Sequence, residues 1–271
     1  MVIERNKPNN DTEPNAHRTP CYDRFRDRIM FPIRDSQGRV IAFGGRVLGD
    51  EKPKYLNSPE TPVFQKSSEL YGLYESKKSG EKFSHLLLVE GYMDVIALAQ
   101  MGIRNAVATL GTATSSRHLT RIFRAVSDVV FCFDGDAAGR NAAWRALETS
   151  LPLMEDGRHV SFLFLPEGED PDTLVRSIGT EGFLREVKQA TPLAQFFFDK
   201  LSEGLDIHSI EGKARLGKLA KPLIRLFPKG VYGKLMLDKL SETLGISGES
   251  LSQLLTSSRS GKESQSHPAE H

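Results

Sequence analysis

The sequence has few cysteines and no long apolar run. Only Cys21 and Cys132 occur among 271 residues, far apart and without a CxxC pair. The chain therefore carries no signature of a zinc site or of a disulfide framework. No apolar run approaches the length that spans a bilayer, and the N-terminus lacks the apolar stretch of a signal peptide. We expect a cytoplasmic protein that makes no membrane contact.

The chain also lacks an excess of either charge. Lys and Arg number 36 against 35 Asp and Glu, a net charge of +1. Overall charge thus gives no indication of a polyanionic partner, and only local charge can do so. Residues 22–66 hold nine basic and six acidic side chains, a modest basic excess. With 39% hydrophobic residues the chain can bury a substantial core.

A strand–turn–helix pattern occurs four times in the middle of the chain. It begins at "HLLLVEG", "NAVATLG", "VVFCFDGD" and "HVSFLFLPEG". We expect the first two strands at Leu86–Val89 and Ala106–Leu110, with the helix after the second capped near Thr114 or Ser115. Continuous apolar strands that alternate with helices predict an α/β fold with a parallel sheet flanked by helices. Right-handed crossovers then place the carboxyl ends of all four strands along one edge.

The segments on either side of this repeat have different sequence patterns. "RIMFPIRDSQGRVIAFGGRVL" indicates two short strands around a turn at Asp35–Gly38, followed by a break at Gly44-Gly45. Beyond Leu193 the pattern is only helical, with Pro222 kinking or ending one helix.

These sequence patterns predict that the chain has five parts. They are a flexible lead-in (1–21), a small mixed, partly basic N-terminal subdomain (22–80), the α/β domain (81–190), a helical subdomain (191–246) and a solvated tail (247–271).

Acidic residues follow three of the four predicted strands. Glu90 comes directly after the first, and "DGD" and "EGEDPDTL" follow the third and fourth. Ligands of open parallel sheets bind beyond the carboxyl ends of the strands. Clustered carboxylates repel one another, and oxygen ligands suit Mg²⁺ or Mn²⁺ rather than zinc. We therefore predict a metal site that holds phosphate, with the ligands Glu90, Asp134, Asp136, Asp170 and Asp172.

Simpler interpretations exist for several of these residues. Asp134 and Asp136 can be a turn aspartate and a helix cap, and Asp172 can be the N-cap of the next helix. We interpret Asp94 as a first-turn residue that complements the helix dipole. His118 belongs to no ligand spacing and is expected on a helix surface. Phenylalanines of the predicted strands and of "FFF" at 196–198 are expected in the core.

The ordered motifs resemble those of a known family. Glu90-Gly91 before a helix and "DGDAAGR" at a strand end resemble the Toprim domain. Together with "FRDRIMFPIRDSQGRVIAFGGRVL", "PKYLNSPET", "LYGL", "VEGYMDV" and "GEDPDTLV", they resemble the DnaG-type bacterial replicative primase over roughly residues 22–246. The resemblance implies synthesis of short RNA primers from ribonucleoside triphosphates on a single-stranded DNA template, within the replication machinery.

The resemblance also implies roles for particular residues. Glu90, Asp134 and Asp136 match the family's catalytic, Mg²⁺-binding acids, and Asp170 and Asp172 match its third acidic pair. Three basic residues match positions linked to template or nucleotide contact. They are Arg46, Lys54 and Lys66.

Two other functions stay open from the sequence. One is a Toprim-fold nucleic-acid-binding scaffold without catalysis, for which five carboxylates would have no use. The other is a Toprim nuclease. The family also carries an N-terminal zinc ribbon and a C-terminal helicase-binding domain, and we expect both to be absent here. This chain would then be a fragment whose activity alone is uncertain, and which reaches the replicative helicase only through the missing domain.

Overall fold

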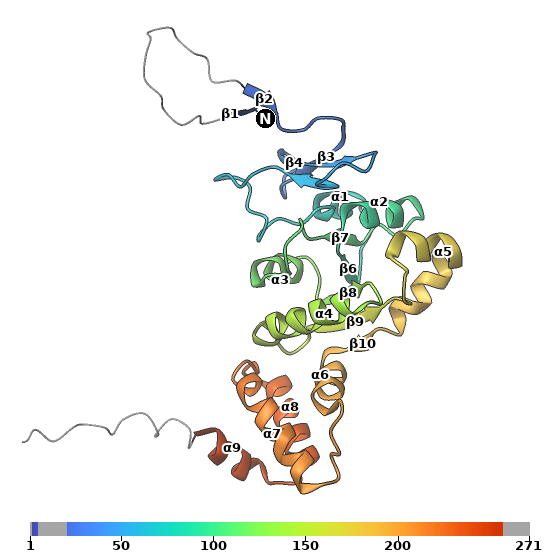
Figure 1. Cartoon of the computed structure of the whole chain (residues 1–271). Helices are drawn as coiled ribbons and strands as arrows, with labels where there is room; N and C mark the ends of the chain where they lie inside the picture. The colour runs from blue at the N-terminus through green and yellow to red at the C-terminus, as the bar shows by residue number, and fades with distance from the viewer. Residues whose placement is uncertain (1, 5–20, 257–271) are drawn as a thin grey trace, which may run out of the picture.

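The computed structural model of the protein describes residues 2–4 and 21–256. Figure 1 shows three parts stacked along the molecule: a small antiparallel sheet, a central α/β body and a group of helices. Within the described residues no helix has the length and apolar character needed to cross a membrane. Most of the predicted lead-in and the end of the predicted tail lie outside the described residues.

The N-terminal part is built from short antiparallel strands. The predicted turn is confirmed, since Asp35 accepts hydrogen bonds from the N–H groups of Gln37 and Arg39. The strands pair in the order β3–β4–β5, and β1 pairs with β2. Their bounds are Val2–Glu4 (β1), Cys21–Asp23 (β2), Arg28–Arg34 (β3), Val40–Val47 (β4) and Tyr55–Asn57 (β5).

The predicted break at Gly44-Gly45 is wrong, because both glycines lie inside β4. A Cβ on Gly44 would stand 3.0 Å from the ring of Tyr92, and one on Gly45 would stand 2.8 Å from the ring of Phe25. The glycines therefore leave room for two aromatic rings against the strand. A missing side chain here serves packing and does not interrupt the ladder.

The central sheet is mainly parallel, as predicted. Its order is β10–β9–β8–β6–β7, and only β10 runs antiparallel to its neighbour. The strands are β6 (His85–Val89), β7 (Ala106–Ala108), β8 (Asp128–Phe133), β9 (His159–Phe164) and β10 (Thr191–Pro192). The helices of this body are α1 (Leu73–Lys78), α2 (Tyr92–Gln100), α3 (Ser116–Phe123), α4 (Ala137–Ser150) and α5 (Pro171–Lys188).

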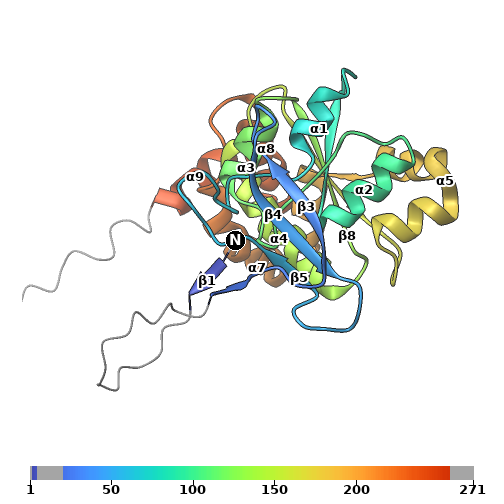
Figure 2. The same ribbon diagram turned by 90° about the horizontal axis from the view of Figure 1, so that it is seen from above.

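Helices cover the sheet so that its parallel strands are buried. Figure 2 shows α2 and α5 together at one side of the molecule, and the two helices are in contact. The rings of Phe131, Phe133 and Phe162 stack in the core, as expected from the apolar strands. On the edge of β7 that does not pair with β6, Ala108 exchanges two backbone hydrogen bonds with Tyr71.

The C-terminal part is helical, as predicted. It contains α6 (Leu193–Ser202), α7 (Ile210–Ile224), α8 (Val231–Leu244) and α9 (Gly248–Thr256). Phe197 is buried, and α7 ends two residues after Pro222. The prediction of a solvated tail from residue 247 is wrong up to residue 256. Ser247 accepts a hydrogen bond from the N–H of Ser250, and Leu251 is buried in the core, so α9 packs onto the bundle.

Candidate metal and nucleic-acid site

Two carboxylates follow neighbouring strands at the carboxyl edge of the sheet. Glu90 lies between β6 and α2, and Asp134 lies between β8 and α4. Desolvation, then the charges of Asp134 and Asp136, raise the pKa of Glu90. Desolvation, then the charges of Asp170 and Asp136, raise the pKa of Asp134. Four of the five predicted acids therefore lie close enough at this edge for their charges to act on one another.

Asp94 belongs to the same group, although sequence reasoning gave it only a role in the helix. It occupies the first turn of α2 and accepts a hydrogen bond from the N–H of Gly91 at 3.0 Å, as that interpretation requires. Desolvation is the main cause that raises its pKa to about 7, and Asp170, Asp134 and Glu90 add to it. Its position one turn after Glu90 was the available signal.

The capping interpretation is confirmed for Asp136, whereas the cap expected at Asp172 is formed by Asp170. Asp136 accepts a hydrogen bond from the N–H of Gly139 at 2.7 Å and caps α4. Asp170, not Asp172, caps α5 through the N–H of Thr173. Each helix N-terminus therefore fixes one carboxylate at the edge of the sheet.

Asp172 is the predicted ligand that the structure does not bring to the cluster. It forms an ion pair with Arg176 one turn further along α5. The Arg176 guanidinium therefore neutralises the carboxylate of Asp172 within the same helix.

Gly135 is required by a close approach between two strand ends. A Cβ on this residue would stand 2.1 Å from the carbonyl oxygen of Leu165, a contact that no side chain can make. The N–H of Leu165 donates to the carbonyl of Phe133 at 3.0 Å, so β8 and β9 stay paired up to this point. The glycine between the two aspartates lets the neighbouring loop pass directly beneath them.

The donor set suits a hard divalent cation, but it does not form a closed cage. Among residues 2–4 and 21–256 no three acidic, histidine or cysteine side chains stand together in an arrangement that could hold an ion. The carboxylates nevertheless raise one another's pKa, and no basic side chain pairs with Glu90 or Asp134 in this part of the chain. Mg²⁺ commonly takes one or two carboxylates and fills its other positions with water and phosphate oxygens. The residues therefore fit a cation that arrives with a phosphate ligand.

A cavity of about 300 Å³ opens beside Glu90. One wall is the loop 111–114, which supplies Thr112 and Thr114, and another is α4 with Arg145. Hydroxyl groups, a guanidinium group and a carboxylate thus line one hollow next to the acidic edge. The rest of its lining is apolar, with Phe131 and Phe133 among the residues, so a small ligand there would meet both apolar and polar walls.

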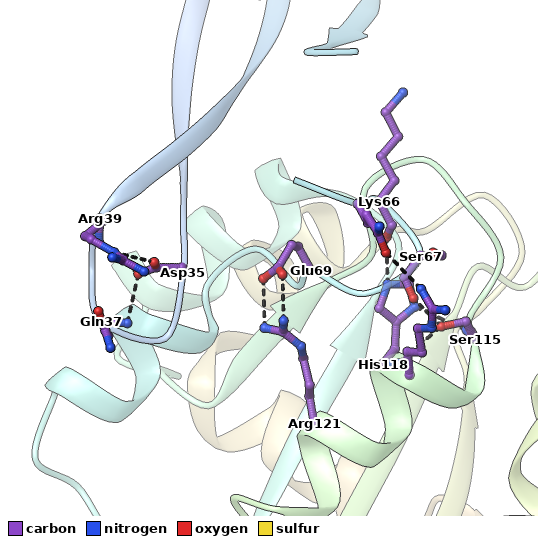
Figure 3. A network of polar contacts seen from close by, with 11 residues as sticks. Asp35, Gln37, Arg39, Lys66, Ser67, Glu69, Ser115, His118 and Arg121 are labelled. Carbon is purple, nitrogen blue, oxygen red and sulfur yellow. Dashed lines mark hydrogen bonds and ion pairs between the residues drawn. The ribbon is translucent and has the colours of Figure 1, made fainter. Parts of the chain in front are cut away.

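The three predicted basic residues lie in the N-terminal part, on β4 and on the segments before and after β5. Arg46 of β4 donates a hydrogen bond to the hydroxyl of Tyr55 at 3.1 Å, and the ring of Tyr55 contacts that of Tyr92 at the start of α2. Lys54 binds neighbouring strands through its carbonyl oxygen, and its side chain is exposed. Lys66 points away from the body in Figure 3, held by its backbone.

Helix α3 holds the segment that carries Lys66, and we call these contacts the α3 clamp (Figure 3). His118 donates from Nε2 to the carbonyl oxygen of Lys66 at 2.8 Å and accepts at Nδ1 from the N–H of Ser115. Ser115 caps α3, as predicted, and its hydroxyl donates to the carbonyl of Ser67. The expectation that His118 lies on a helix surface is wrong. The residue is fully buried, and both ring nitrogens have hydrogen-bond partners.

The clamp ends in a charged pair one turn further along α3. Arg121 donates two hydrogen bonds to Glu69, at 2.8 and 2.6 Å. Desolvation raises the pKa of Glu69, and the Arg121 guanidinium opposes that shift. The segment after β5 is thereby fixed against α3 of the α/β body. Contacts between residues about fifty positions apart leave no periodic signal in the sequence.

Comparison with known families gives three matches along the chain. Residues 10–77 match the N-terminal domain of the DNA primase catalytic core, and residues 87–175 match a Toprim-like domain. Residues 194–249 match a family described as the DnaB-helicase binding domain of primase. This last match falls on α6 to α8 and differs from our expectation that every helicase-binding part is absent.

Curated relatives and solved structures point to the same family. A DNA primase of Pseudomonas aeruginosa is 62% identical over 86% of this chain, and one of Escherichia coli K12 is 56% identical over 84%. The chain spans 35% and 39% of the lengths of these relatives.

The structural matches cover more of each neighbour. The crystal structure of a DNA primase domain from Pseudomonas aeruginosa superposes with a TM-score of 0.84 at 60% identity, over 89% of this chain and 75% of that one. A structure of the DnaG primase catalytic domain bound to ssDNA gives a TM-score of 0.80 at 54% identity, over 85% and 73% of the two chains.

Proposed function

Because the chain belongs to the DnaG-type DNA primase family, with its catalytic core and Toprim domain, we propose that it synthesises short RNA primers on single-stranded DNA. The substrates are ribonucleoside triphosphates. The observation that carries the proposal is the unpaired acidic edge formed by Glu90, Asp134, Asp136 and Asp170. We place this activity in the cytoplasm, at the replicating chromosome.

Glu90 and Asp134 would hold Mg²⁺ or Mn²⁺, because their charges lack basic partners among the described residues. Such a cation, when bound, neutralises triphosphate and lowers the pKa of an attacking hydroxyl. Asp136 and Asp170 keep their orientation because each also caps a helix. Asp94 lies behind this edge and adds negative charge to it.

The basic residues would contact template or nucleotide phosphates from the N-terminal part. Lys54 and Lys66 extend outward, while Arg46 is fixed against Tyr55. We expect Lys54→Ala to weaken binding of single-stranded DNA two- to threefold and to lower the salt slope by about 0.7, the value of one phosphate contact on a single strand. Fluorescence anisotropy between 50 and 200 mM salt measures this. The matched control is Lys78→Ala on α1, and an unchanged slope in Lys54→Ala would make Lys54 ordinary surface.

The direct test of the function is primer synthesis. The protein is incubated with single-stranded DNA, labelled ribonucleoside triphosphates and either Mg²⁺ or Mn²⁺, and short RNA is resolved on a gel. Labelled DNA in a parallel reaction tests the nuclease alternative. RNA that depends on template and metal supports a primase, DNA cleavage supports a nuclease, and DNA binding without either product supports a scaffold.

The match at residues 194–249 supports a second partner, the replicative helicase. We propose that α6 to α8 contribute to this contact. Analytical ultracentrifugation of the chain with a DnaB-type helicase tests it, with a chain ending at residue 192 as the comparison. Co-sedimentation of both chains to the same extent would remove the helical part from the interface.

A further inference from the structure

We propose that a pocket between α4, the end of β9 and α6 binds a nucleobase, either of an unpaired strand or of a free nucleotide. The inference rests on the proposed function, since it requires a chain that works on nucleic acid. The cavity has a volume of about 400 Å³, within the range of ligand sites. Its walls are formed by Arg140, Phe164, Phe196, Asp199, Lys200 and Glu203.

Two aromatic rings reach the surface at this pocket. The core stack of Phe131, Phe133 and Phe162 is buried, whereas Phe164 and Phe196 are only half-buried. Their ring centres lie 5.3 Å apart with the rings tilted. Aromatic rings with an open face stack on bases of any sequence, because every base has a π-face.

A guanidinium group lies beside the same rings. The central carbon of Arg140 stands 5.9 Å from the ring centre of Phe164, and the Arg140 side chain is exposed. Arginine and phenylalanine together form the kind of surface on which single-stranded nucleic acid stacks.

The charges around the pocket favour a base over a phosphate. Arg140 and Lys200 are balanced by Asp199 and Glu203, so the walls carry no net charge. Lys200 donates to Glu203 at 2.5 Å, and the Lys200 ammonium, with a smaller contribution from Arg140, holds the pKa of Glu203 below its ordinary value. A phosphate would meet two carboxylates here, whereas a base can stack on the rings and donate its N–H groups to those carboxylates.

The pocket lies close to the acidic edge. Arg140 is one helical turn after Asp136 on α4. Phe164 precedes Leu165, whose N–H donates to the carbonyl of Phe133, the residue before Asp134. A strand that crosses the acidic edge can therefore place a neighbouring base in this pocket. The stacking would hold that strand without any contribution from the metal.

The protein contains a built-in reporter for this test. Trp144, the one tryptophan of the chain, contacts the ring of Phe196 with 6.4 Å between ring centres. Its fluorescence, excited at 295 nm without metal or triphosphate, is followed while a twelve-residue deoxyadenosine strand, an abasic strand of the same length or AMP is added. We expect saturable quenching by the deoxyadenosine strand and little by the abasic strand. Quenching by AMP as well would identify a free nucleotide as a second occupant.

Variants separate the pocket from general DNA binding. Arg140→Ala and Phe196→Leu are expected to weaken binding of the deoxyadenosine strand about five- to tenfold, in line with the loss of one stacked base. Arg185→Ala on the outer face of α5 is the matched control and should bind as the parent does. Circular dichroism confirms that the variants fold. Equal affinity for the abasic and deoxyadenosine strands, or unchanged affinity in Arg140→Ala, would overturn the inference.

The proposed function and this inference can fail separately. If primers are made but the abasic strand binds equally well, only the stacking pocket is wrong. If bases quench Trp144 through Arg140 and Phe196 but no RNA forms with either metal, only the proposed primase activity is wrong.

Discussion

The acidic edge and the α3 clamp lie beside neighbouring strands and differ in how their carboxylates are paired. In the clamp, Glu69 is buried and receives two hydrogen bonds from Arg121, which offset part of the desolvation that raises its pKa. At the acidic edge, Glu90 and Asp134 have no such partner among the described residues, and desolvation and mutual repulsion raise the pKa of each.

The difference distinguishes a charged pair that stabilises the fold from a cluster of charges that is available to bind a ligand. A buried group with all its partners stabilises the folded state, and its removal leaves another group unpaired. A cluster of like charges destabilises the folded state until something neutralises it. Substitutions in the two regions should therefore move stability in opposite directions.

The largest effect is expected for Asp134→Ala. This variant should lower metal-dependent RNA synthesis at least a hundredfold, because the unpaired carboxylate that would hold the cation is gone. Its melting temperature should stay equal or rise, since a repulsive charge has been removed. Glu186→Ala, an exposed carboxylate in the last turns of α5, is the control for activity. Activity of Asp134→Ala within tenfold of the parent would show that the edge is not the reaction site.

Next in size is Arg121→Met, which leaves the Glu69 carboxylate buried without its partner. We expect a loss of about 2–3 kcal/mol in the free energy of unfolding, somewhat below that of a fully buried pair because Arg121 is 31% exposed. Urea unfolding measures the loss.

The matched control is Arg176→Met, whose ion pair with Asp172 lies at the surface, with Arg176 58% exposed. It should cost less than about 1 kcal/mol. Equal losses in the two variants would mean that the clamp does not differ from a surface ion pair.

A third variant, Gly135→Ala, tests the close approach beneath the acidic edge. The new methyl group would meet the Leu165 carbonyl, so the loops after β8 and β9 must move apart. We expect a loss of about 2 kcal/mol in thermal or urea unfolding and weaker metal binding. Gly49→Ala is the control, because no atom lies within 4 Å of a Cβ at that position. If both variants lose the same free energy of unfolding, the loops after β8 and β9 can accommodate a methyl group at residue 135.

The smallest effect is the pH dependence of Asp94→Asn. Asp94 has a pKa of about 7 in the folded protein and 3.8 as an ordinary aspartate. Between these values the folded state binds more protons than the unfolded state, so stability falls as the pH rises from about 4 to about 7. The asparagine keeps an acceptor for the N–H of Gly91 and does not ionise.

Asp94→Asn should therefore gain stability over the parent at pH 8, on the order of 1–2 kcal/mol, and gain less at pH 5. Melting curves at the two pH values measure the difference. A gain that is the same at both values would show that Asp94 does not carry the raised pKa.

The sequence allowed prediction of those features that arise from local pattern. Apolar runs located the parallel strands, and their ends located Glu90 and Asp134. The antiparallel β10 was missed because two residues give no periodicity. Helix α9 was missed because Ser-rich composition concealed its cap at Ser247 and the buried Leu251.

Long-range contacts could not be predicted in the same way. His118 looked like a surface residue because its partners at Lys66 and Ser115 meet it only in the folded chain. Asp94 looked complete as a helix residue, and only the strand order shows that it faces Asp134 and Asp170. Both cases arise where one side chain serves a helix terminus and a tertiary contact together.

The ends of the central sheet govern how this protein can associate with other chains. At one edge β10 has only two residues, and Pro192 has no N–H to offer. At the other edge Tyr71 already takes both backbone groups of Ala108. Neither margin offers a row of free backbone groups to a strand from another copy, so the sheet resists edge-to-edge aggregation. Once folded, this body can therefore meet other molecules through its helices and loops, and not by adding a strand to the central sheet.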